Sequence, residues 1–376
     1  MKNLVDEKYL LDVLTRLMNI PSPSGMTDDI VRLVCDELDA LQIQYELTRR
    51  GAIRAILKGQ AVKPRRAIVS HLDTLGAMVK SIKTNGRLSI VPIGNWSPRF
   101  AEGARVTIHS DGNKTTSGTV LPLKASGHTY DTEVDKQPSS WENLEVRVDE
   151  RVMSMSCLWE RGLRVGDFIS FDHQLDISES GFINSRFLDD KAGVASMLAA
   201  VQSMRVNDIL PALNSSLLFT ISEEIGIGAS HVLRGNVAEM VSIDNGTIAP
   251  GQNTCEFGVT IAKMDSSGPF DAHLTKQLID ICIEENIEFS RDVFLHYRSD
   301  AAAALEAGND IRTALICFGL DASHGYERVH LDSLKSITHL IISYLESPPL
   351  FKKEMNVIGL EKEYPLIRTS PELKPS

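Results

Sequence analysis

The sequence has no Cys-x-x-Cys pair, although it contains five cysteines. They lie far apart in the chain, at Cys35, Cys157, Cys255, Cys282 and Cys317. An odd number of cysteines at wide spacings does not form a disulfide framework, and without close pairs it indicates neither a zinc ribbon nor a thiol redox motif. We therefore expect reduced cysteines that pack in the core.

The sequence also lacks a dense block of Lys or Arg, and its net charge is −11. Such a surface would repel the phosphates of nucleic acids and the headgroups of anionic membranes. No apolar stretch is as long as a membrane span, and residues 1–8 include acids where a signal peptide needs an uninterrupted apolar run. We expect a cytoplasmic protein that binds neither nucleic acid nor membrane.

The chain of 376 residues is too long for one small core, so we expect two domains. Residues 80–178 contain short β-type runs separated by turn signals such as Asn85-Gly86, whereas strands alternate with amphipathic helices on either side. The pattern predicts an α/β fold, with a mixed central sheet sandwiched by helices and a small inserted β-rich domain. The expected segments are 1–79 and 179–346 for the α/β domain, 80–178 for the insert, and 347–376 for a tail that contains prolines.

Two adjacent acids, Asp189 and Asp190, precede a strongly apolar helical pattern that runs from Ala192 to Val201. An acid at the start of a helix can serve only to cap its free backbone N–H groups. Four other segments, however, also end in a metal-ligand type of residue at the point where a core strand stops. We therefore interpret the acidic pair as the floor of a metal site.

In those four segments an apolar strand is followed by a histidine or an acid. In an open α/β sheet, ligands bind beyond the carboxyl ends of the strands, so these side chains should converge on one edge. The residues are His71, the pair Glu223-Glu224, Asp244 and His324.

Each of these motifs also has a simpler explanation. His71 could cap a loop at the end of its strand, but Asp73 two residues later is well placed to accept the second ring N–H of a metal-bound histidine. Glu223 and Glu224 could lie on a solvated loop tip, but the segment that follows them is apolar and tightly turned. Adjacent carboxylates in such a place raise one another's pKa unless a cation neutralises them.

Two histidines, one shared aspartate and one further carboxylate for each ion would form a binuclear site for borderline-soft cations. A second glutamate would remain as a general base. Sites of this kind hydrolyse amides, because two ions lower the pKa of a bridging water and stabilise both the attacking oxygen and the carbonyl oxygen.

The chain resembles the tetrahedral aminopeptidase family of dinuclear zinc metallopeptidases, which includes the glutamyl and deblocking aminopeptidases. The matching motifs occur in the order of the family up to about residue 346. They are His71-Leu72-Asp73, Val91-Pro92-Ile93-Gly94-Asn95-Trp96, Leu188-Asp189-Asp190-Lys191-Ala192-Gly193, Glu223-Glu224-Ile225-Gly226, Ile243-Asp244 and Ser323-His324.

The resemblance implies a role for each residue of the site. Asp189 would bridge two divalent ions, which are zinc or, alternatively, cobalt or manganese. The remaining ligands would be His71, Glu224, Asp244 and His324. Glu223 would be the general base, and Asp73 would orient His71. The resemblance also implies cleavage of N-terminal peptide bonds through a metal-bridging hydroxide, and assembly through the insert into a homo-oligomer, a dodecamer.

Three positions depart from the common pattern of the family, and none of them removes a ligand. Thr74 stands where many members have Glu, Arg298-Ser299-Asp300 replaces Gly-Thr-Asp, and Gly325 follows His324 in place of Ser. A subgroup associated with the N-acetylglutaminylglutamine amide osmoprotectant has a similar pattern.

Two other functions stay open on the sequence. A deacylase would use the same ions on an N-acyl amino acid or a related amide, and Arg298 could bind the carboxylate of that substrate. A non-catalytic scaffold would have lost a ligand or the base, whereas all of these residues are present.

Overall fold

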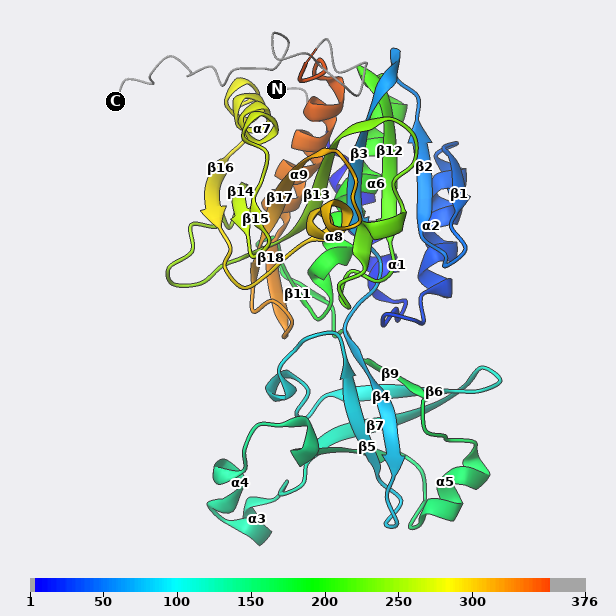
Figure 1. The fold of residues 1–376 in the computed structure, drawn as a ribbon. Helices are drawn as coiled ribbons and strands as arrows, with labels where there is room; N and C mark the ends of the chain where they lie inside the picture. The colour runs from blue at the N-terminus through cyan, green and yellow to red at the C-terminus, as the bar shows by residue number, and fades with distance from the viewer. Residues whose placement is uncertain (1–3, 352–376) are drawn as a thin grey trace.

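The computed structural model describes residues 4–351 and shows two parts joined by two chain crossings (Figure 1). The larger part is a sheet with helices packed against it, and the smaller part is a β-barrel. The barrel is formed by a segment inserted between strand β3 and strand β10. This arrangement confirms the α/β fold class with a small β-rich insertion.

The large sheet has 12 strands within the described residues. Nine of them follow the order β1-β2-β12-β3-β13-β17-β18-β11-β10, and β14 pairs with β15, β16 and β17. The strands are β1 (Gln44–Leu47), β2 (Ile53–Leu57), β3 (Ala61–His71), β10 (Asp176–Ile177), β11 (Phe182–Ser185), β12 (Leu213–Thr220), β13 (Val237–Thr247), β14 (Val259–Asp265), β15 (Gly268–Pro269), β16 (Phe289–Val293), β17 (Arg312–Asp321) and β18 (Glu327–His330).

The four central strands β12, β3, β13 and β17 are parallel to one another. Their apolar residues are almost all buried, as expected for strands covered on both faces. Helix α6 packs on β3 and β13 and is itself flanked by α1 and α9. The helices of this part are α1 (Glu7–Met18), α2 (Asp28–Ala40), α6 (Leu188–Val206), α7 (Ala272–Glu284), α8 (Asp300–Glu306), α9 (Leu331–Glu346) and the 3-10 turn η3 (Gly228–His231).

The inserted barrel closes in the order β4-β5-β8-β7-β6-β9 around its own apolar core. Its strands are β4 (Gly76–Ile82), β5 (Leu88–Ile93), β6 (Arg105–Ser110), β7 (Lys114–Pro122), β8 (Leu144–Val148) and β9 (Phe168–Phe171). Short helices interrupt the connections between these strands: η1 (Pro98–Phe100), α3 (Gly127–Tyr130), α4 (Glu133–Lys136), η2 (Trp141–Asn143) and α5 (Met155–Arg161). The domain boundaries expected from the sequence, with the insert at 80–178, stay a prediction.

The start of the predicted tail is fixed by Arg66, a fully buried residue of β3. Its guanidinium pairs with Glu239 at 3.1 Å and donates to the carbonyls of Tyr344, Ser347 and Pro348. Residues 352–376, including the stretch from Thr369 expected to be loosely ordered, lie outside the described residues. In the described chain, no helix has the length and apolarity to cross a bilayer. The cytoplasmic location stays a prediction.

Candidate metal centre

The parallel strands end at one edge of the sheet, and the predicted ligands lie there. His71 is the last residue of β3, and Thr220, the last residue of β12, stands beside it in the parallel register. After β12 ends at Thr220, Ile221 and Ser222 lead directly to Glu223 and Glu224. Asp244 belongs to β13, the neighbour of β3 on its other side. The register of three neighbouring strands therefore brings these side chains to one place.

Two groups of side chains in this place could each hold a metal ion. One consists of His71, Glu223 and Asp244, and the other of His71, Asp189 and Glu224. Within each group, the ligand atoms lie within 4.8 Å of one another. His71 belongs to both groups, so the two candidate positions are neighbours.

Asp189 lies between the two histidines predicted as ligands. Its Oδ1 is 3.2 Å from His71 Nε2, and its Oδ2 is 3.4 Å from His324 Nε2. His324 Nε2 is also 3.6 Å from Glu224 Oε2. The structure thus brings together all five residues predicted as ligands, with Asp189 facing both imidazoles.

The first residues of α6 have a special backbone that suits this position. Asp189 and Asp190 have non-helical dihedral angles, so the regular helix begins only after them. Asp190 Oδ2 accepts hydrogen bonds from the Ser70 hydroxyl and from the His71 N–H at 3.2 Å, which fixes the end of β3. A Cβ on Gly193 would lie 2.2 Å from Asp190 Oδ1, so this glycine makes room for the carboxylate.

Asp73 contacts His71 differently from the prediction. His71 Nδ1 lies 2.9 Å from the backbone carbonyl oxygen of Asp73, whereas the nearest carboxylate oxygen of Asp73 is 3.7 Å away. The Asp73 carboxylate instead accepts the backbone N–H groups of Glu223 at 3.0 Å and Glu224 at 3.3 Å. Asp73 therefore holds the turn that carries both glutamates.

Sequence reasoning missed two further residues that organise the site. Asn245 donates to Asp189 Oδ2 at 2.8 Å and to Asp244 Oδ1 at 3.1 Å. Buried Glu327 accepts the backbone N–H of Asp189 at 3.2 Å and that of His324 at 3.0 Å. Asn245 directly follows a predicted ligand, which is a weak signal, and nothing in the local sequence marks Glu327.

The barrel reaches the site through its Gly94-Asn95-Trp96 segment. The Asn95 carbonyl lies 2.9 Å from His324 Nδ1 and so leaves Nε2 free to face the carboxylates. Gly94 has a φ of +82°, and a Cβ there would lie 2.5 Å from Leu75. The Trp96 indole donates to the Gly76 carbonyl at 3.2 Å, which anchors the segment. This motif therefore orients a predicted ligand from outside the α/β part.

The electrostatics of the site reflect the crowding of acids away from water. Burial, together with neighbouring carboxylates, raises the pKa of Glu224 to about 7 and holds the pKa values of Glu223 and Asp244 well above their usual range. Burial lowers the pKa of His324, but Glu224 and Asp189 outweigh it and raise that pKa to about 10. Burial also opposes the charge of Asp189, but His324 and His71 outweigh it and lower the pKa of that carboxyl. Without added positive charge, the site therefore favours protons on the two glutamates, Asp244 and the imidazoles rather than on Asp189.

The residues present fit a pair of divalent cations. Imidazole nitrogens combined with carboxylate oxygens are the usual ligands of zinc and related ions. The second ring nitrogen of each histidine meets a backbone carbonyl, the arrangement typical of metal-bound histidines. Asn245 Oδ1 and Asp190 Oδ1 are buried beside this cluster without a hydrogen-bond partner among the described residues.

Comparison with known proteins gives the family. Residues 51–340 match the sequence profile of the M42 glutamyl aminopeptidases. The chain belongs to this M42 family. The assignment confirms the resemblance inferred from the motifs and makes the protein a peptide-bond hydrolase.

Relatives of this M42 chain include a Bacillus subtilis (strain 168) protein, YhfE, provisionally named as an aminopeptidase. It is 37% identical over 338 residues, which cover 90% of this chain and 97% of the relative. Among solved structures, the aminopeptidase APDkam598 from Desulfurococcus kamchatkensis has a TM-score of 0.83 at 20% identity, with 94% of this chain and 99% of that one covered. The Pyrococcus horikoshii TET1 peptidase has a TM-score of 0.79 at 21% identity, with 89% of this chain and 99% of that one covered. That peptidase can assemble into a tetrahedron or a large octahedral shell.

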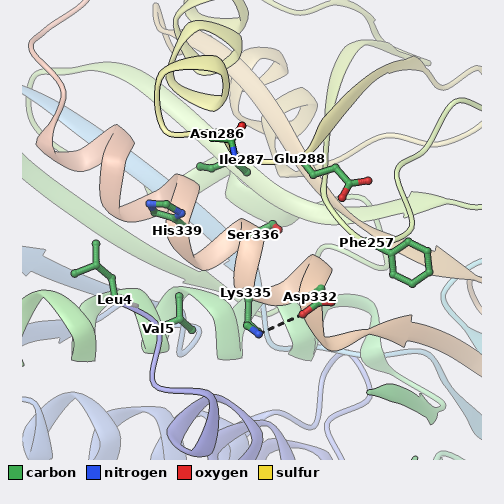
Figure 2. Close-up of a pocket in the computed structure, with 10 residues that line it drawn as sticks. All are labelled: Leu4, Val5, Phe257, Asn286, Ile287, Glu288, Asp332, Lys335, Ser336 and His339. Carbon is green, nitrogen blue, oxygen red and sulfur yellow. Dashed lines mark hydrogen bonds and ion pairs between the residues drawn. The ribbon is translucent and has the colours of Figure 1, made fainter. Parts of the chain in front are cut away.

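A hollow of about 480 Å³ lies elsewhere on the M42 chain (Figure 2). It is lined by the first half of α9, by residues 286–288 and by Leu4 and Val5 near the N-terminus. Lys335 in this hollow already pairs with Asp332 at 3.2 Å and with Glu7 at 3.3 Å. The hollow shares no residue with the two ligand groups, so it is separate from the candidate metal centre.

The raised pKa values predict how pH affects the stability of metal-free protein. Glu224 has a pKa of about 7 and Asp300 a pKa of about 6 when folded, both above their ordinary values. The folded state thus binds more protons than the unfolded state, and this contribution is lost as pH rises through those values. We expect the free energy of unfolding of metal-free protein to fall by on the order of 1–3 kcal/mol between about pH 5 and about pH 7.

Thermal unfolding of chelator-treated protein at a series of pH values measures this effect. The Glu224→Gln variant is the control, because it removes one of the titrating groups and should flatten the slope. Readdition of zinc should raise Tm more at pH 7 than at pH 5, since cations bind the deprotonated ligands. A Tm of metal-free protein that rises over this range would contradict the electrostatic description.

Proposed function

We propose that this chain is a dinuclear metal-dependent aminopeptidase that hydrolyses the N-terminal peptide bond of peptides. The observation that carries the proposal is the pair of adjacent ligand groups at the strand edge, with Asp189 between the two imidazoles. Membership of the M42 family supports the peptidase reaction, and the donor atoms support the dependence on metal.

The ligands divide between two neighbouring positions. His71 and Asp244 would hold one ion, Glu224 and His324 the other, and Asp189 would use one carboxylate oxygen for each. When bound, two such cations act as Lewis acids and lower the pKa of water at the site. Zinc suits this mixture of imidazole and carboxylate, and cobalt or manganese are the alternatives.

Glu223 is the residue that would move the proton. Its Oε2 lies 3.9 Å from His71 Nε2, so the carboxylate faces the ligands. Burial holds its pKa well above the usual range, so this carboxylate binds a proton more readily than an exposed glutamate does. The carboxylate would accept a proton from the attacking water and donate it to the nitrogen of the leaving amine.

The aminopeptidase reaction requires a substrate with a free α-amine, and the excess of carboxylates at the site favours such a cation. A deacylase would need a group that binds the carboxylate of an N-acyl amino acid. Arg298 was the residue that kept this alternative open. Its Nη2 lies 2.6 Å from Glu306 Oε2, so its guanidinium already has an acidic partner. The aminopeptidase is therefore the better-supported function, and the osmoprotectant subgroup stays a hypothesis about its substrate.

Substitution of Glu223 tests its role as a base rather than a ligand. We expect Glu223→Gln to retain its metal and to lose roughly 10²- to 10⁴-fold in kcat, because a general base contributes about that much. Asp189→Ala should lose metal together with activity. Kinetics with an amino-acyl p-nitroanilide and elemental analysis of the same samples give both quantities.

The matched control is Glu306→Gln, which removes a carboxylate of the same size outside the site and should keep both metal and kcat. A Glu223→Gln variant with near-normal turnover would move the base role to another residue. Active wild-type protein without divalent metal would contradict the whole proposal.

Paired substrates separate the aminopeptidase from the deacylase. We expect cleavage of amino-acyl p-nitroanilides with free amines, little cleavage of their N-acetyl forms, and less than about threefold change in kcat/KM for Arg298→Ala. The pairing with Glu306 is the reason for the small effect. Steady-state kinetics with both substrate series are the measurement.

Glu306→Gln again provides a sharp comparison, because it frees the guanidinium of Arg298. Were N-acetyl amino acids the better substrates, with KM raised in Arg298→Ala and lowered in Glu306→Gln, the enzyme would be a deacylase.

We also propose that the chain assembles into a homo-oligomer, as the Pyrococcus horikoshii TET1 peptidase does, with a dodecamer as the expected form. The barrel exposes large apolar side chains around α5: Met153 is 86% exposed, Val165 65% and Trp159 51%. Exposed apolar surface of this kind is often used in contacts between proteins. The barrel therefore offers a surface for contacts between copies.

Charged substitutions test this surface. The double variant Met153→Lys, Trp159→Asp should give smaller species than the wild type in light scattering, because it places unpaired charges in an apolar contact. Val62→Asp, at an equally exposed apolar residue on β3, is the control and should keep the wild-type size. A monomeric wild-type protein would contradict the proposed assembly.

A further inference from the structure

The loop between α1 and α2 lies against the segment that follows His71. Its residues Ser22 and Ser24 are 0% and 5% exposed. The backbone N–H of Ser24 donates to the Thr74 carbonyl at 3.1 Å, and that of Thr74 donates to the Ser22 carbonyl at 2.9 Å. Pro23 and Thr74 form a parallel bridge. The loop is thus paired with the chain immediately beyond the first ligand.

The two serines of this loop have different acceptors. The Ser22 hydroxyl donates to the backbone carbonyl of Leu72 at 2.8 Å. The Ser24 hydroxyl donates to the carboxylate of Asp73, at Oδ2. Of these two bonds, only that of Ser24 is made to the Asp73 carboxylate, which accepts the backbone N–H groups of Glu223 and Glu224.

Asp73 is fully buried, and a buried carboxylate is costly unless hydrogen bonds compensate its charge. Its donors are the Ser24 hydroxyl and the backbone N–H groups of Glu223 and Glu224. Oδ2 receives both the serine and the Glu224 N–H. The serine therefore fixes the rotamer of the carboxylate on which the turn depends.

We propose that Ser24 is a positioning residue for the reaction, which acts through the Asp73 carboxylate on the turn that holds Glu223 and Glu224. The expected effect of Ser24 on the rate of peptide hydrolysis rests on the proposed function. Its structural part, the link from Ser24 to the turn, stands independently of that function. A serine that merely fills buried space would affect stability but not the geometry of the turn.

The test compares Ser24→Ala with Ser22→Ala, since both remove a buried hydroxyl from the same loop. In Ser24→Ala we expect hydrogen exchange of the peptide spanning residues 221–226 to be faster in the metal-free protein. Zinc affinity, measured by competition with a chelator, and kcat should each fall roughly 10- to 100-fold, the usual cost of losing a partner of a ligand. KM should change little, because the Ser24 side chain is buried and its hydroxyl donates to Asp73.

Ser22→Ala should leave the exchange of residues 221–226, the zinc affinity and kcat close to wild type, whatever its effect on Tm. Ser24→Thr retains a hydroxyl and should restore a large part of the zinc affinity and kcat. Wild-type exchange and zinc affinity in Ser24→Ala, or equal losses in both alanine variants, would overturn the proposal. If wild-type protein cleaved no amino-acyl substrate, the proposed function would fail, while exchange and zinc affinity would still decide the role of Ser24.

Discussion

The structure depends on the burial of many carboxylates at one edge of a parallel sheet. Asp189, Glu223, Glu224 and Asp244 lie close to one another around two imidazoles. Isolated charges of this kind are too costly to bury, so the fold must supply protons, hydrogen-bond donors or cations. The raised pKa values of Glu223 and Glu224 show that hydrogen bonds alone do not compensate the burial of their negative charge when no cation is bound. The site is therefore arranged for positive charge that the side chains alone do not provide.

A second set of acids holds the backbone rather than facing the centre. Asp73 accepts the N–H groups of Glu223 and Glu224, and Glu327 accepts those of Asp189 and His324. Each of these buried carboxylates thus ties together ligand segments that are far apart in the sequence. Their hydrogen bonds satisfy their own charge and fix the loops at the same time, so the ligands are held in place before a cation binds.

The sequence was sufficient to bring most of the predicted ligands to one edge, because His71, Glu224, Asp244 and His324 lie near the ends of strands with apolar centres, and parallel strands end at a common edge. His71 and Asp244 could be located in this way without a structure. The partners of these residues could not, because they come from distant segments: Ser24 reaches Asp73 across 49 positions, and Glu327 reaches Asp189 across 138. The particular atom of Asp73 that meets His71 could not be read from the sequence for a related reason. Spacing suggested a side-chain contact with His71, whereas its carbonyl makes that contact and leaves the carboxylate free for another loop.

The position of the insertion follows from the same edge of the sheet. The chain leaves for the barrel just after β3 has delivered His71, and it returns at β10 and β11 before α6 brings Asp189. The returning chain is held near the start of α6, because the Arg186 N–H donates to the His173 carbonyl at 2.9 Å. Both crossings therefore lie near predicted ligands, and the barrel stands next to the site. The Asn95 carbonyl then reaches His324, and Gly325 packs against the ring of Phe100, so the barrel forms part of the surroundings of a ligand. Contacts that fix the barrel consequently bear on the orientation of His324.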